Sequence, residues 1–511
     1  MTAFKETIAK AYATEGAAVD LGRGVHEDTL EREAVVRLPL GTINRHGLIA
    51  GATGTGKTRT LQLIAEQLSD AGVAVFAADY KGDLSGLMQE APAEGKASER
   101  MQDLGLPHEP AAYPVELLSL GGIGPGVPVR ASVTDFGPQL LAKVLGSNET
   151  QESSLALVFR FADEKGLALV DLADLRALLT YLDSDAGKKD LEGIGGVSGQ
   201  TIGVLLRSLV ELEDGGGTEF FGEPQLEIGD LLRAAPDGRG VVSCLELAAV
   251  QDRPRLFSTV LMWLVAELFE QLPEIGDVER PKLVFFFDEA HLLFDEATKA
   301  FLESVERTVR MIRSKGVGVF FVTQQPTDLP SGVLGQLGAR VQHALRAFTP
   351  EDADALRKTV RTYPKSDFYD LEQLLTSLGI GEAAVTLLDE RGVPTPVVHT
   401  RLRAPRSSME PAPNVDATSK ASPLWAKYGT RLERETASEV LAARVERAAQ
   451  TEPERAPAKP KRPRTEQPSS GDPLTDFLSS RQGRALQREV VRGVFGMLRK
   501  RLRPSAAPEQ R

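Results

Sequence analysis

The sequence is poor in cysteine and contains no long uninterrupted apolar run. Its 511 residues include a single cysteine, Cys244, which excludes an intrachain disulfide and a cysteine-ligated metal cluster. The apolar run Leu261–Ala266 is closed by Glu267, after far fewer than the roughly 20 residues that span a bilayer. The chain begins with acidic and basic residues and has no long apolar core there, unlike a signal peptide. We therefore expect a cytoplasmic protein with no transmembrane helix, in which Cys244 packs within a strand.

Basic residues are also scarce in the body of the chain, and they gather near its end. Residues 451–511 hold 14 Lys and Arg against 7 Asp and Glu, which leaves 46 against 65 for residues 1–450. The net charge of −12 therefore divides into about −19 for the body and about +7 for the tail. An acidic body argues against a broad nucleic-acid-binding outer surface, although a basic lining inside a ring pore stays open.

The pattern that is present from His46 onward is an alternation of apolar strands with helical stretches. A helix is expected from Lys57 to about Asp70. The expected strands are residues 47–50, 73–78, 240–245, 283–287, 318–323 and 341–345. This alternation predicts an α/β fold with a mainly parallel sheet and crossover helices. Ahead of it, residues 5–15 predict a short helix and residues 35–38 a strand.

Three segments depart from this alternation. Residues 134–235 repeat Leu and Ala between charges, which predicts a helical insertion. Residues 404–472 are rich in Pro, Ser and charge, which predicts a largely disordered linker. Residues 473–511 place apolar side chains and arginines at helical spacing, which predicts a basic amphipathic helical tail. The remaining segments are an N-terminal helix and strand segment, residues 1–45, and the two parts of the α/β core, residues 46–133 and 236–403.

The strongest motif is a glycine-rich loop between an expected strand and an expected helix. Residues 51–58 match the pattern GxxxxGK[ST], in which backbone amides and a helix N-terminus form an anion cradle. Lys57 would reach the β- and γ-phosphates, and Thr58 would place its hydroxyl on magnesium. A mere glycine-rich turn is the alternative, and the strand–loop–helix setting argues against it. The expected nucleotide contacts are Gly51, Ala52, Thr53, Gly54, Thr55, Gly56, Lys57, Thr58 and Arg59.

A second motif supplies the acids that hydrolysis needs. The apolar residues 283–287 deliver Asp288 and Glu289 at the end of a strand. Asp288 would hold magnesium through water, and Glu289 would polarise the water that attacks the γ-phosphate. The alternative is a core strand that is merely capped by acids. The two motifs together predict an enzyme that binds ATP and Mg²⁺ and hydrolyses the ATP.

Two other strand ends carry polar residues. Gln324 follows the strand 318–323, where an amide could orient water or sense the γ-phosphate. A turn residue before Pro326 is the alternative. Asp79 and Asp83 follow the strand 73–78 and could assist the metal shell, and turn chemistry around Gly82 is an equal alternative.

Taken in order, these motifs make the chain similar to the HerA/FtsK superfamily of ring ATPases, and within it to the bacterial YjgR-like branch with a HerA-like C-terminal ATPase domain. The resemblance covers most of residues 20–403. The stretches that carry it are residues 44–58, 81–86, 220–224, 282–293, 312–318 and 335–348.

The resemblance implies a RecA-like P-loop core, a homohexamer, and ATP bound between neighbouring subunits. It gives Lys57, Thr58, Asp288, Glu289 and Gln324 the roles argued above. It also implies an arginine that reaches the nucleotide: Arg346 is the first candidate, expected on the strand after Gln324, and Arg340 and Arg313 are weaker ones. HerA proteins also share an N-terminal β-barrel, for which about 45 residues ahead of the loop are too few.

Two functions follow from these expectations. In the first, the ring uses ATP to translocate or remodel double-stranded DNA, and basic residues in the pore or in the tail contact the phosphates. In the second, the protein is a nucleotide-dependent assembly or switch ATPase, and the tail docks protein partners. Salt-dependent DNA binding would separate the two.

Overall fold

The computed structural model describes residues 2–191, 195–276, 278–294, 299–389, 391–432 and 435–443. The chain divides into two compact units. The first unit is formed by the described residues of Met1–Ala131 and Pro224–Arg431, and the second by those of Ser132–Glu223 and by the described residues between 432 and 443. In the described part of the chain, no helix is both long and apolar enough to cross a bilayer.

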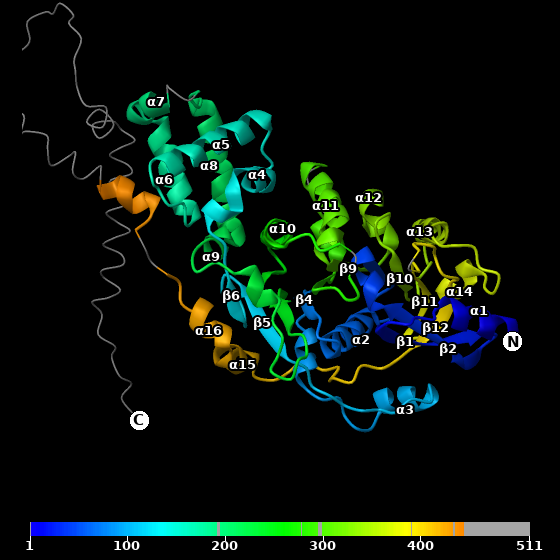
Figure 1. Cartoon of the computed structure of the whole chain (residues 1–511). Coiled ribbons are helices and arrows are strands. Elements are labelled where there is room, and N and C mark those ends of the chain that lie inside the picture. Colours follow the sequence, from blue (N-terminus) through cyan, green and yellow to red (C-terminus); the bar gives the residue numbers. More distant parts are fainter. Residues whose placement is uncertain are drawn as a thin grey trace, which may run out of the picture. The chain divides into compact units, whose positions relative to one another are not determined.

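The first unit is built on a 12-stranded sheet in the order β2-β1-β12-β11-β10-β3-β9-β8-β4-β7-β5-β6 (Figure 1). The eight strands from β10 to β6 pair in parallel, and the other four strands pair antiparallel. The strands are β1 Ala18–His26, β2 Thr29–Pro39, β3 Gly47–Ala50, β4 Ala74–Asp79, β5 Val115–Leu120, β6 Val127–Val129, β7 Val242–Glu246, β8 Leu283–Phe287, β9 Val317–Thr323, β10 Ala339–Gln342, β11 Glu382–Thr386 and β12 Val398–Leu402. The predicted α/β fold with a mainly parallel sheet is confirmed, and β1 and β2 extend this sheet.

Helices cover both faces of the sheet. The helices of this unit are α1 Thr2–Ala11, α2 Lys57–Asp70, α3 Lys96–Asp103, α10 Pro254–Gln271, α11 Lys299–Ile312, α12 Ser331–Leu334, α13 Pro350–Val360, α14 Leu371–Ser377, α15 Val415–Ala421 and α16 Pro423–Tyr428. Figure 1 shows α10 and α11 on one side of the sheet and α2 on the other. Two parallel strands need a crossover connection, because the chain must return from the end of the first strand to the opposite end of the sheet before the next strand begins. Helices make most of these crossovers.

The central strands are apolar on both faces because both faces are covered. Phe286 of β8 and Phe320 of β9 belong to the same apolar core as the inner side chains of α2. On the opposite face, the rings of Phe287 and Phe321 lie 5.5 Å apart between centroids. Cys244 is buried within β7, as the sequence predicted.

The second unit is helical in its described part. Its helices are α4 Val133–Val144, α5 Glu149–Glu164, α6 Leu172–Asp183, α7 Asp185–Leu191, α8 Gly199–Leu212 and α9 Thr218–Phe220. Capping boxes begin α5, at Asn148 and Gln151, and α6, at Asp171 and Asp174, and each satisfies free amides of the first helical turn. The second carboxylate oxygen of Asp174 accepts the Ser438 amide at 2.9 Å, which ties a much later segment to this unit.

The segment boundaries differ from those expected. The insertion was expected at 134–235, whereas the second unit takes Ser132–Glu223 and residues 224–235 return to the first unit. The linker was expected from residue 404, yet α15 and α16 lie within it and Tyr428 is buried. Leu424 and Tyr428 of α16 are buried, and α16 contacts β6 of the first unit, so this part of the expected linker is folded. Residues 444–511, with the remainder of the expected linker and the whole expected tail 473–511, lie outside the described residues.

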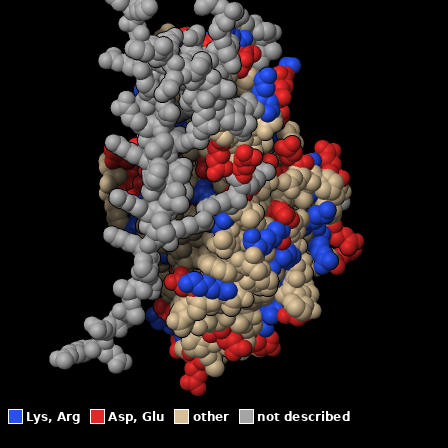
Figure 2. Space-filling model, turned by 90° about the vertical axis from the view of Figure 1, so that its left-hand side faces the viewer, with Lys and Arg blue, Asp and Glu red and all other residues tan. Residues whose placement is uncertain are grey.

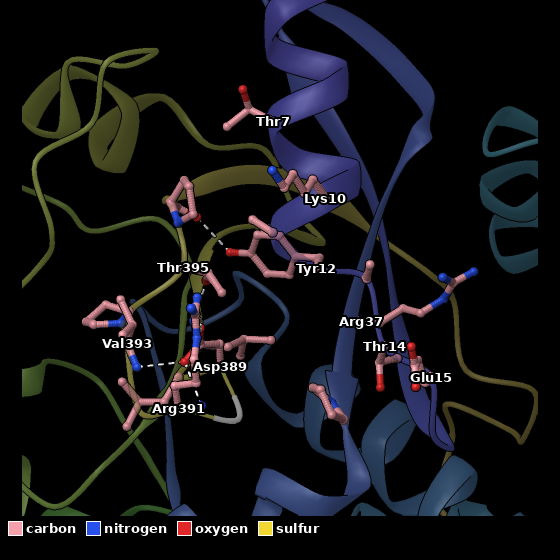
Figure 3. A pocket seen from close by; sticks show the side chains of 17 residues that line it. Thr7, Lys10, Tyr12, Thr14, Glu15, Arg37, Asp389, Arg391, Val393 and Thr395 are labelled. Atoms are coloured by element: carbon pink, nitrogen blue, oxygen red, sulfur yellow. Dashed lines mark hydrogen bonds and ion pairs between the residues drawn. The ribbon is translucent and has the colours of Figure 1, made fainter.

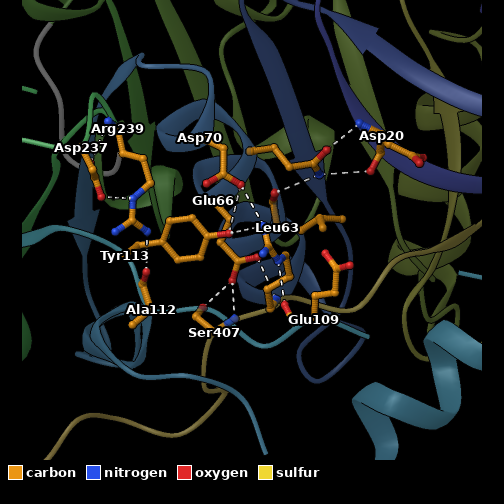
Figure 4. Close-up of polar contacts among 12 residues, drawn as sticks. Asp20, Leu63, Glu66, Asp70, Glu109, Ala112, Tyr113, Asp237, Arg239 and Ser407 are labelled. Carbon is orange, nitrogen blue, oxygen red and sulfur yellow. Dashed lines mark hydrogen bonds and ion pairs between the residues drawn. The ribbon is translucent and has the colours of Figure 1, made fainter. Parts of the chain in front are cut away.

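A buried polar network fastens the segment 404–410 to α2. The Glu66 carboxylate accepts the amides of Arg406 at 2.8 Å and Ser407 at 2.9 Å, and it also accepts the Ser407 hydroxyl (Figure 4). Gln62, one turn earlier, donates to the Ser408 carbonyl at 2.7 Å. Burial raises the pKa of Glu66, and the bonds from Arg406 and Ser407 partly offset that rise. The helix that follows the phosphate loop is therefore held by a segment more than three hundred residues away.

We expect Glu66→Gln to lower the free energy of unfolding of the first unit by about 1–3 kcal/mol, because an amide NH₂ would then face buried donors. Urea unfolding of both proteins measures the difference. Glu109→Gln is the matched control, because the Glu109 side chain is exposed in the same neighbourhood. Equal losses in the two variants would contradict the proposed importance of the network.

Candidate functional site

The phosphate loop joins β3 to α2 and is anchored from three distant segments. The Gly51 amide donates to the Gln324 carbonyl at 3.1 Å, the Ala52 amide to the Ala344 carbonyl at 2.8 Å, and the Gly381 amide to the Thr55 carbonyl at 3.1 Å. Gly51 has φ +153°, and a Cβ there would stand 2.5 Å from the Cβ of His343. Only glycine fits this close approach, so the loop shape depends on residue 51.

Lys57 begins α2 and folds back over the loop. Its Nζ donates to the Gly51 carbonyl at 2.7 Å and to the Ala52 carbonyl at 3.3 Å, and the side chain is buried. Burial lowers the pKa of Lys57, and the negative charges of Glu289 and Asp288 partly oppose this. The ammonium, the loop amides and the N-terminus of the 14-residue α2 together form a concentrated positive site for a phosphate chain.

The two acids follow β8 directly and lie within the electrostatic reach of Lys57. Asp288 is 1% exposed, and within the described residues its Oδ2 has no hydrogen-bond partner. Burial and then the charge of Glu289 raise the pKa of Asp288 to about 7. A buried carboxylate with an unused oxygen suits a divalent cation, which would supply the missing positive charge. Thr58, half-buried in the first turn of α2, offers a hydroxyl of the kind that magnesium binds in P-loops.

Glu289 is held differently from its neighbour. Its backbone lies in the left-handed region, with φ 47° and ψ 48°, an unusual conformation for a residue with a side chain. Lys81 donates to its Oε1 at 2.6 Å, and the His291 Nδ1 lies 3.5 Å from its Oε2. Burial raises the pKa of Glu289, but the Lys81 hydrogen bond and the charges of Lys81, Lys57 and His291 together outweigh that effect, and the net shift is downward. Glu289 is therefore a buried carboxylate that stays ionised.

Sheet order brings these groups to one edge. The phosphate loop follows β3, Gln324 follows β9, the acids follow β8, and Lys81 follows β4, and these four strands are consecutive neighbours. The carboxyl ends of parallel strands meet at the same edge of a sheet, where ligands bind in open α/β folds. The Gln324 side chain is exposed beside the loop that its own carbonyl anchors. Its proposed contact with the γ-phosphate stays a prediction.

The three candidate arginines lie in different settings. Arg340 is on β10 and donates to the Thr362 carbonyl at 2.7 Å, so its guanidinium serves the fold. Arg313 begins the short 3₁₀ helix η7, Arg313–Lys315. Arg346 was expected on a strand, but β10 ends at Gln342, and Arg346 lies exposed in the irregular stretch that follows. The strand ends early because the next residues turn to anchor the phosphate loop through the Ala344 carbonyl.

Of the two roles considered for Asp79, metal binding and turn formation, the structure shows turn formation. Its Oδ1 accepts the amides of Lys81 at 3.2 Å and Gly82 at 2.8 Å, and its Oδ2 accepts the Leu84 amide at 2.7 Å. Burial, and then the charge of Asp83, raise the pKa of Asp79 to about 6. The carboxylate thus shapes the turn that presents Lys81.

Sequence reasoning missed three polar residues at this edge, of which His343 and Glu246 are buried and Lys81 is exposed. His343 approaches the Thr60 Oγ1 to 2.9 Å through its Nε2, Glu246 ends β7 beside Asp79, and Lys81 pairs with Glu289. Burial and then the charge of Asp79 raise the pKa of Glu246 to about 8. The available signal was their position at the ends of apolar strands, since such ends converge in a parallel sheet.

A separate hollow of about 830 Å³ lies between α1, β2 and residues 387–396 (Figure 3). The Tyr12 hydroxyl donates to the Pro396 carbonyl at 2.8 Å, and Arg391 pairs with Asp389 at 3.1 Å. None of its lining residues belongs to the phosphate loop or to the acid pair. The chemistry of the sequence motifs therefore lies elsewhere.

Comparison with known proteins identifies the family and the fold of the chain. A model of the family described as "Helicase HerA-like C-terminal" matches residues 25–503. No match to the chain is found among curated proteins. The bacterial conjugative coupling protein TrwBdeltaN70, in its unbound monoclinic form, is 16% identical with a TM-score of 0.51, over 80% of this chain and 95% of that one. The plasmid coupling protein TrwB in complex with ADP and Mg²⁺ is 15% identical with a TM-score of 0.52, over 80% and 94%. At such identities these likenesses show the fold, and they confirm the RecA-like P-loop architecture.

We expect His343 to make the first unit less stable in acid. Burial and the charge of Lys57 lower the pKa of His343 to about 4, against an ordinary value near 6.5. Between these values the unfolded chain binds more protons, so stability is full above about pH 6.5 and falls by up to about 3 kcal/mol toward pH 4. Urea unfolding at several pH values should show a shallower acid loss in His343→Gln. His108→Gln, at a partly exposed histidine, serves as control, and identical pH slopes for His343→Gln and wild type would contradict the prediction.

Proposed function

The chain belongs to the HerA-like helicase C-terminal family of P-loop ATPases, and from that premise we propose that it is a Mg²⁺-dependent ATP hydrolase that forms a homohexameric ring and translocates double-stranded DNA in the cytoplasm. The observation that carries the hydrolase is the meeting of Lys57 and the phosphate loop with Asp288 and Glu289 at one sheet edge. This arrangement combines an anion cradle, an unpaired buried carboxylate and an ionised carboxylate.

Each group has a distinct part in the proposed reaction. The amides of residues 51–58 bind the phosphates, and Lys57 exchanges its carbonyl contacts for phosphate oxygens. Thr58 and Asp288 would hold Mg²⁺, which neutralises phosphate charge when bound. The complex of TrwB with ADP and Mg²⁺ supports this choice of ligands for the same fold.

Glu289 would act as the general base. A proton passes from water to its carboxylate, the water oxygen bonds to the γ-phosphorus, and the bond from that phosphorus to the ADP oxygen breaks. Gln324 would orient the water or report the nucleotide state. Arg346, exposed beyond β10, would reach the transferring phosphate within its own subunit or across the ring.

The DNA substrate rests on the family description, and the charge of the described surface limits where DNA could bind. Lys and Arg side chains are mixed with Asp and Glu on the described surface visible in Figure 2. No broad basic field covers the described residues on that face, so DNA would be contacted by cations gathered locally, as in a pore. Such contacts release counterions and depend strongly on salt.

Glu289→Gln should lower the kcat of ATP hydrolysis by about 100-fold or more, because the amide cannot accept the proton of water. Steady-state phosphate release measures the rate, and binding of a fluorescent ATP analogue should be retained. The matched control is Glu279→Gln, at an exposed position near the opposite end of β8. Unchanged hydrolysis in Glu289→Gln would remove Glu289 from the reaction.

Linear duplex DNA should raise the hydrolysis rate at low salt, and the stimulation should decline steeply as salt increases. The same phosphate assay with and without DNA measures this, and Glu289→Gln gives the background. Hydrolysis that is indifferent to DNA at low salt would contradict the translocase and favour a switch that acts on protein partners.

A further inference from the structure

Lys81 reaches the acid pair from a neighbouring strand. It follows β4, which lies beside β8 in the sheet, and its Nζ lies 2.6 Å from Glu289 Oε1. The Lys81 side chain is 41% exposed, whereas the Glu289 side chain is 8% exposed. Because the ammonium is open to solvent, screening weakens the contribution of the pair to stability. The contact instead fixes the position of the Glu289 carboxylate.

The turn that carries Lys81 has a fixed shape. The Asp79 carboxylate accepts amides from residues 81, 82 and 84, and Gly82 has φ +76°. A Cβ at Gly82 would lie 3.2 Å from Glu246 Oε2, so the turn also packs closely on the end of β7. Gln251 donates to the Tyr80 carbonyl at 2.8 Å and holds the other side of the turn. The ammonium is thus presented from a rigid base, which is what a positioning group requires.

The contact distinguishes the two oxygens of Glu289. Oε1 is occupied by Lys81, whereas within the described residues the buried Oε2 accepts no hydrogen bond, with the His291 Nδ1 at 3.5 Å. The left-handed backbone at Glu289 and the fixed Oε1 together restrict the carboxylate to one orientation. Oε2 is therefore the oxygen left to receive a proton from water.

We propose that Lys81 is a positioning residue for ATP hydrolysis, which holds Glu289 by Oε1 so that Oε2 meets the attacking water. This inference rests on the proposed hydrolase function. Lys81 keeps its own proton throughout, and its contribution is geometric. A misplacement of about 1 Å in a reacting group can cost roughly 100-fold in rate, so loss of the contact should affect kcat and leave nucleotide binding intact.

The test compares Lys81→Met, Lys81→Arg and wild type in the full-length chain. We expect Lys81→Met to lower kcat by about 10- to 100-fold with KM for ATP within about twofold, and Lys81→Arg to recover most of the rate. Lys96→Met, at an exposed lysine that begins α3, controls for removal of a surface charge. Thermal unfolding and binding of a fluorescent ATP analogue verify that each variant folds and binds.

Several outcomes would overturn the proposal while hydrolysis by the wild type stands. An unchanged kcat in Lys81→Met would do so, and so would a raised KM at constant kcat, which would make Lys81 a nucleotide-binding group. A wild type without Glu289-dependent hydrolysis would instead overturn the proposed function itself.

A double-mutant cycle tests the turn. If Asp79 acts through Lys81, Asp79→Asn lowers kcat alone but adds nothing to Lys81→Met. Losses that multiply in the double variant would overturn that link and show that Asp79 acts on the reaction independently of Lys81.

Discussion

Parallel pairing of β3, β9, β8 and β4 is the constraint on which the site depends. It places the ends of four strands side by side, although the residues that follow them are scattered over more than two hundred positions of the chain. The phosphate loop, Gln324, the acid pair and Lys81 each come from one of these ends. A change of strand order would separate groups whose individual motifs were intact, so the sheet, more than any motif, assembles the site.

The same edge concentrates buried charge. Burial and neighbouring acids raise the pKa values of Asp79, Asp288 and Glu246 to about 6, 7 and 8. Glu289 differs, since its burial is outweighed by Lys81 together with the charges of Lys57 and His291, and its pKa is lowered. Carboxylates that lie close together in a low dielectric have pKa values that differ, because their like charges disfavour each other. The site therefore contains one carboxyl group suited to a cation and one carboxylate suited to act as a base. The positive partners come from separate segments: Lys57 begins α2 after the phosphate loop, and Lys81 lies in a turn that the Asp79 carboxylate holds.

The phosphate loop is held by contacts with distant segments of the chain as well as by contacts among its own residues. Segments at residues 324, 344 and 381 contact its backbone, and Glu66 on α2 fastens residues 406 and 407. The segment after residue 404 therefore belongs to the scaffold of the site, although its composition suggested a linker. Proline and serine content indicates the average tendency of a stretch to remain unfolded. It does not show that a few side chains in the stretch, such as Tyr428, are buried in the folded protein.

The sequence by itself determined the elements and the motifs: the strand before Gly51, the helix from Lys57, the acids after Phe287 and the mainly parallel sheet. These depend on local periodicity, glycine placement and short spacing, which neighbouring residues carry. Only the tertiary structure decided that Lys81 meets Glu289, that His343 closes on Gly51, and that Arg340 is engaged in the fold whereas Arg346 is exposed. Such pairings depend on strand order and side-chain packing over long separations, and no local pattern encodes which strand ends will become neighbours.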